Sequence, residues 1–167
     1  MTNALTPLFE HSLWANLRLL EACRSLNGSK LELAIPGVYG TPASTFVHYI
    51  SGEQRYVFRL SGEEPAVRLK SDDPWPGFDD LVARTHWSAE RLLRLAESTG
   101  PNTVTHQFFD GVDHEVSADV ILVQAINHST EHRAHIVTTL SAHGISMPEI
   151  DGWTWGTATG RMRPLPR

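Results

Sequence analysis

Four segments of the chain carry apolar residues at helical spacing with polar residues between them. The predicted helices cover residues 7–26, 42–60, 78–97 and 118–143. Pro42 suits the first turn of the second helix, because its missing N–H would have no partner there. Ser117 can cap the fourth helix, and Gly144 suits the left-handed position just past its end.

The connections between these segments differ in kind. Residues 61–77 contain two glycines and three prolines, a composition that cannot continue a helix. Two short β-type runs, 104–109 and 112–116, flank Asp110-Gly111, a dipeptide suited to a two-residue turn. The pattern predicts an all-α fold: a four-helix bundle with a long crossover between helices two and three and a small β-hairpin before helix four. We expect a single domain over residues 1–167, with the tail from Ile145 packed back over the bundle.

Composition narrows the functional classes. The 14 basic and 19 acidic residues give a net charge of −5, and no Lys/Arg cluster stands out, which disfavours nucleic-acid binding. The single cysteine, Cys23, excludes an internal disulfide, fits a reducing compartment and is expected to be buried and inert. The N-terminal residues do not resemble a signal peptide, and no apolar run reaches about 18 residues. We therefore expect a cytoplasmic protein with no membrane partner.

The candidate chemistry lies in the fourth helix. Steps of four and seven residues rotate a helix by about 40° and −20°, so His128, His132 and His135 share one face. The second helix offers one further histidine, His48, among apolar neighbours. Neutral imidazoles are common ligands of divalent metals, and two of them one turn apart can chelate one ion.

Three histidines from two helices, His48, His128 and His132, would leave a metal with a vacant position for water or substrate. His135 lies one more turn along and is expected to line the pocket or act through hydrogen bonds, without ligating the ion. Each imidazole must be neutral to bind, so affinity should fall below about pH 6. Glu53 is expected to be a surface or dimer-contact charge, and Arg133 to form a structural ion pair.

The sequence resembles the DinB-like (YfiT-like) metal-binding four-helix proteins. The resemblance covers most of the chain and is carried by Leu13-Trp14-Ala15-Asn16, Phe46-Val47-His48-Tyr49-Ile50 and Asn127-His128-Ser129-Thr130-Glu131-His132-Arg133. It implies that His48, His128 and His132 bind a divalent ion, zinc or nickel, and that the chain forms a homodimer. The family motif usually continues with Gly-Gln, where this chain has Ala134-His135. Relatives include thiol-dependent transferases and a mycothiol-dependent maleylpyruvate isomerase.

Two functions fit these residues. The first is a metal-dependent hydrolase or a transferase that uses a low-molecular-weight thiol, with the ion lowering the pKa of water or of the thiol. A small-molecule substrate is then expected. The alternative is a non-catalytic metal-binding protein for stress response or sequestration. A bundle that only dimerises would require the three histidines to be free of metal.

Overall fold

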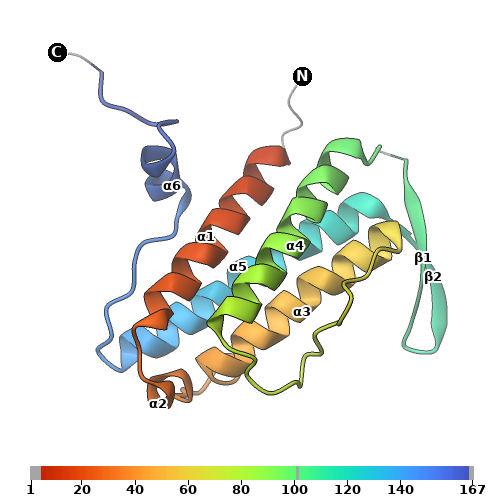
Figure 1. The fold of residues 1–167 in the computed structure, drawn as a ribbon. Helices are drawn as coiled ribbons and strands as arrows, with labels where there is room; N and C mark the ends of the chain where they lie inside the picture. Colours follow the sequence, from red (N-terminus) through yellow and green to blue (C-terminus); the bar gives the residue numbers. More distant parts are fainter. Residues whose placement is uncertain (1–4, 101, 166–167) are drawn as a thin grey trace.

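The computed structural model describes residues 5–100 and 102–165, and in these residues it contains six helices and one antiparallel pair of strands (Figure 1). The elements are α1 (Thr6–Arg24), α2 (Gly28–Leu31), α3 (Pro42–Ser61), α4 (Phe78–Ser98), β1 (Val104–Phe109), β2 (Val112–Ser117), α5 (Ala118–Ala142) and α6 (Gly152–Ala158). No helix in the described ranges is long and apolar enough to cross a membrane.

Local signals explain most of the element ends. The Thr41 hydroxyl accepts from the Ser44 N–H, and the Ser44 hydroxyl accepts from the Thr41 N–H, so α3 begins with a reciprocal cap just before Pro42. In the hairpin, Asp110 and Gly111 have φ of 53° and 77°, as the predicted two-residue turn requires. Ser117 occupies the N-cap position of α5, but its side chain makes no capping hydrogen bond, contrary to the sequence prediction.

Two short helices were not predicted. α2 has four residues, too few for an apolar period to show, and its Asn27 side chain accepts from the Lys30 N–H. α6 lies in the tail, where the Asp151 side chain accepts from the Thr154 N–H. Both segments carried a helix-start signal in the sequence, since Asn and Asp are favoured N-cap residues.

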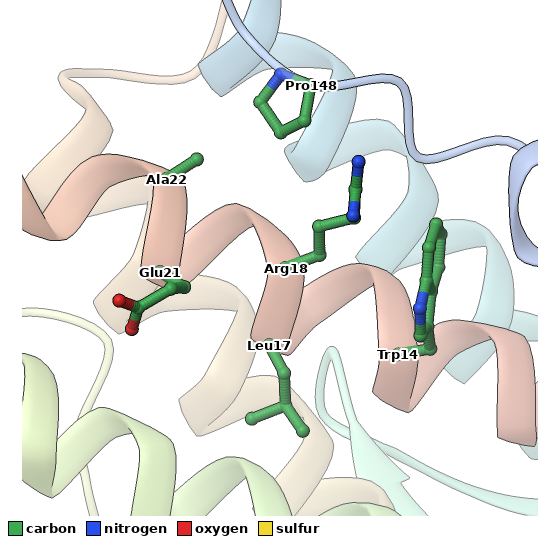
Figure 2. Close-up of a pocket in the computed structure, with 6 residues that line it drawn as sticks. All are labelled: Trp14, Leu17, Arg18, Glu21, Ala22 and Pro148. Carbon is green, nitrogen blue, oxygen red and sulfur yellow. The ribbon is translucent and has the colours of Figure 1, made fainter. Parts of the chain in front are cut away.

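The C-terminal segment runs back along α1, as the sequence predicts (Figure 1). The Arg18 guanidinium donates to the Glu149 carbonyl, and His11 Nε2 lies 2.9 Å from the Ile150 carbonyl oxygen. Figure 2 shows the cleft between this segment and α1, where Trp14, Arg18 and Pro148 border one cavity. The half-buried Trp14 therefore faces the tail.

The four long helices pack against one another, with α3 in contact with both α4 and α5 and α1 mainly against α4. Their buried apolar residues form two clusters, one towards α2 and one towards the hairpin. Every long helix contributes to both clusters, for example α3 through Ile50 and Val57 and α5 through Ile136 and Leu122. Between the clusters, each of these helices places buried polar side chains.

This polar layer is centred on Glu53 of α3. Its carboxylate accepts from Asn16 Nδ2 of α1 (2.9 Å), Ser88 Oγ of α4 (2.7 Å) and Ser129 Oγ of α5 (2.8 Å). The Arg133 guanidinium of α5 donates to the Asn16 side-chain oxygen (2.7 Å). All four long helices thus meet at one hydrogen-bonded group.

The expectations for Glu53 and Arg133 were wrong. Glu53 is 3% exposed, because α3 is covered on several sides, so the helix face opposite His48 points into the protein. Arg133 is also buried and is linked to Glu53 through the Asn16 amide, which replaces the predicted ion pair. Burial raises the pKa of the Glu53 carboxyl, and the hydrogen bonds it accepts counteract part of this effect.

We predict that Glu53→Ala lowers the free energy of unfolding by about 3 kcal/mol, because three buried donors lose their acceptor. Urea denaturation would measure this loss. Glu131→Ala, the same substitution at an exposed position of α5, is the matched control and should change stability little. Equal effects of the two substitutions would contradict the central role of Glu53.

Candidate metal centre

The packing of α3 against α5 brings three histidines together. His48 comes from α3, and His128 and His132 come from successive turns of α5. Each offers one ring nitrogen to a group whose atoms lie within 4.8 Å of one another. The Nε2 atoms of His48 and His128 are 3.1 Å apart. These are the three residues that the sequence singled out.

The donor set fits a small divalent ion. A tetrahedral site with metal–nitrogen bonds of about 2.05 Å separates its nitrogens by roughly 3.3 Å, so modest ring rotation would close this group on an ion. The Nδ1 atoms of His128 and His132 are buried and have no hydrogen-bond partner among the described residues. For His128 this is not the nitrogen that faces His48, so Nε2 is the atom available to an ion.

Ser71 holds the ring of His48 from the side opposite the other histidines. Its hydroxyl oxygen lies 2.6 Å from His48 Nδ1. When Nδ1 donates to this hydroxyl, Nε2 keeps its lone pair and faces His128. Ser71 lies in the crossover between α3 and α4, so this long connection supports the site.

Tyr39, in the loop before α3, covers the histidines. Its ring stacks on His48 with centroids 4.1 Å apart and meets the His132 ring edge-on at 5.0 Å. The Tyr39 N–H also donates to His135 Nδ1 over 3.4 Å. His135 therefore lies beside His132, with ring centroids 5.3 Å apart, and one of its nitrogens is engaged by the backbone.

Gly52 provides the space that His128 occupies. A Cβ atom at Gly52 would lie 2.8 Å from Cε1 of His128, closer than nonbonded carbons approach. Gly52, Tyr39 and Ser71 were not predicted to be parts of the site. For Gly52 a signal existed, since a glycine one turn after His48 on the same helix face permits close approach of another group.

Burial and mutual proximity keep the three imidazoles neutral. Desolvation, followed by the charges of His48 and Arg55, lowers the pKa of His128 to about 4. Desolvation, with the neighbouring histidines, lowers the pKa of His132 to about 3, and desolvation and Arg55 also lower the pKa of His48. Neutral imidazole is the metal-binding form, so protons compete with an ion only at a lower pH than free histidines would predict.

Comparisons with known proteins agree with this architecture. The family model described as DinB family matches residues 1–161. The crystal structure of a DinB-like protein from Bacillus cereus ATCC 10987 is similar, with a TM-score of 0.63 and 14% sequence identity. The alignment covers 84% of this chain and 91% of that chain, which shows a shared fold. A comparison with curated proteins gave no significant match.

We predict that Gly52→Ala weakens zinc binding by tenfold or more, on the order of the loss seen when the groups that position metal ligands are changed. The added methyl group would displace His128, whereas helix propensity favours alanine by about 1 kcal/mol, so the metal-free protein should remain folded. Competition with a chromophoric chelator would measure affinity.

The matched control is Gly28→Ala, where a Cβ atom meets nothing within 4 Å. This variant should bind zinc as the wild type does. Wild-type affinity in Gly52→Ala would show that His128 does not need its observed position for metal binding.

The lowered pKa values also predict how the metal-free protein responds to acid. Below about pH 6.5 the unfolded chain protonates these histidines while the folded chain does not. The free energy of unfolding therefore decreases as the pH is lowered. For His132 this loss continues until the pH approaches its folded pKa of about 3. Chemical denaturation at a series of pH values should give a steeper loss below pH 6.5 for the wild type than for His132→Ala. Parallel curves would contradict the shift.

Proposed function

The chain belongs to the DinB family, and from this membership and the three-histidine group we propose that it binds one divalent metal ion through His48, His128 and His132 and uses it in a metal-dependent reaction. The observation that carries the proposal is the convergence of three neutral ring nitrogens from α3 and α5. An ion held there supplies Lewis-acid chemistry, which lowers the pKa of a coordinating water or thiol.

The surrounding residues have distinct tasks in this proposal. Ser71 fixes the His48 ring so that its free lone pair faces the site. Tyr39 shields the rings of His48 and His132 from water on one side. Gly52 leaves room for His128. We propose zinc or nickel as the ion, because imidazole nitrogen suits both metals.

We assign α1, α3, α4 and α5 to one four-helix bundle that forms a single domain over residues 1–167. The polar layer around Glu53 supports this, since it joins all four long helices by hydrogen bonds.

The reaction class is a hydrolysis or the transfer of a small thiol. Both need an open ligand position, and the engagement of His135 Nδ1 by the Tyr39 N–H favours three protein ligands over four. A non-catalytic metal-binding protein is the alternative, and it would be favoured if His135 closed the site as a fourth ligand.

We predict that the purified wild type contains about one divalent ion per chain and that His132→Ala loses most of it, since two imidazoles alone bind weakly. His135→Gln is the matched variant on the next turn and should retain the metal. Elemental analysis measures both, and circular dichroism checks folding. Full occupancy in His132→Ala would refute the ligand set. Equal loss in the two variants would make His135 a ligand and favour the non-catalytic alternative.

A further inference from the structure

A positively charged cavity lies beside the three histidines. It has a volume of about 340 Å³ and lies between α3 and the crossover segment. Its lining includes Ser51 and Arg55 from α3 and Arg68, Lys70, Ser71 and Asp72 from the crossover. Neither the proposed metal ligands nor the polar layer around Glu53 belongs to this lining.

The crossover segment is fixed to α3 at both sides of this cavity. The Leu69 N–H donates to the buried Gln54 side chain over 3.0 Å, and the Leu69 side chain is itself buried. Two residues further on, the Ser71 hydroxyl contacts His48 Nδ1. Ser71 therefore belongs both to the cavity wall and to the support of His48, and the cavity lies on the Nδ1 side of the His48 ring, opposite the other histidines.

The charges in this cavity are not balanced. Three cationic side chains face one carboxylate, and one of the three, Arg68, pairs with Glu64 outside the cavity. Among the described residues, Arg55 and Lys70 have no acidic partner within ion-pair distance. The chain as a whole carries a net charge of −5, so this local excess of positive charge runs against the composition.

Other cavities of similar size do not share this excess. The cavity that includes Arg91 and Arg94 also includes Glu63 and Glu97, and Arg91 pairs with Glu63. In another cavity, Arg161 pairs with Glu10. In both of these linings the numbers of cationic and acidic side chains are equal, whereas the cavity next to the histidines has three of the former and one of the latter.

We propose that this cavity binds a small oxyanion, a carboxylate or a phosphate, on the Nδ1 side of His48. This anion site is separate from the proposed metal ligands. A guanidinium, an ammonium and the Ser71 hydroxyl are donors suited to oxyanions, and charge-assisted hydrogen bonds are the strong ones. A divalent ion held by neutral imidazoles would add further positive charge nearby, which favours an anionic ligand.

The test is a titration of isotopically labelled, zinc-loaded protein with inorganic phosphate and, separately, with acetate, at constant ionic strength. The amide signals of Leu69, Lys70 and Ser71 report on the cavity. We expect saturable shifts with at least one anion, and the anion that binds more tightly identifies the group. Arg55→Gln should weaken binding by about tenfold, the expected effect of losing one charge-assisted hydrogen bond. Lys70→Gln should weaken it less, because an ammonium cannot bind an oxyanion in the bidentate manner of a guanidinium.

Arg94→Gln is the matched control, because it removes the same charge from an exposed position of α4. It should bind the anion as the wild type does. Non-saturating shifts with both anions, or equal affinities in Arg55→Gln and Arg94→Gln, would overturn the proposal.

The variant His132→Ala separates this inference from the proposed function. Its metal content tests the ligand set, whereas the anion titration of the same protein tests the cavity without the ion. Anion-induced shifts of Leu69 and Ser71 that persist there support the cavity whatever the metal analysis shows. Loss of these shifts in the folded variant would place the anion on the metal and overturn the cavity assignment.

Discussion

The buried carboxylate of Glu53 is the constraint on which the arrangement of the long helices depends. A carboxylate taken out of water is costly unless donors replace its solvation, and here the donors come from Asn16, Ser88 and Ser129 on three other helices. Apolar packing alone tolerates helices that slide or rotate against one another, because dispersion and area burial have little direction. Hydrogen bonds at 2.7–2.9 Å do not, so the polar layer fixes the helices in one register.

That register also determines the geometry of the three histidines. Glu53 follows Gly52, which makes room for His128, and the donor Ser129 follows His128 in the chain. Arg133, which supports Asn16, follows His132. Each contact in the polar layer thus fixes a residue next to one that faces the histidine group. The polar layer fixes the candidate ligands from the interior, while Ser71 and Tyr39 contact His48 from the surface side.

The crossover between α3 and α4 has a larger part than its irregular sequence suggests. It has no helix or strand of its own, yet Leu69 anchors it to Gln54 and Ser71 brings it to His48. Long loops are often functional when a rigid scaffold positions them. Here the loop gives His48 its hydrogen-bond partner and places positive charge next to an otherwise neutral group of imidazoles.

The sequence by itself determined what depends on residues near in the chain: the four long helices, the turn at Asp110-Gly111, and the shared face of His128 and His132 on one helix. It also indicated His48, the one histidine of the second predicted helix, which the family resemblance names as a ligand. Only the tertiary structure decided that Glu53 is buried, that Gly52 leaves space for His128, and that Ser71 and Tyr39 reach the site. Periodicity tells which side of a helix is apolar, but it does not tell how many neighbours cover that helix. Polar residues on the remaining sides of α3 therefore look exposed in the sequence, although α3 is surrounded once the helices pack.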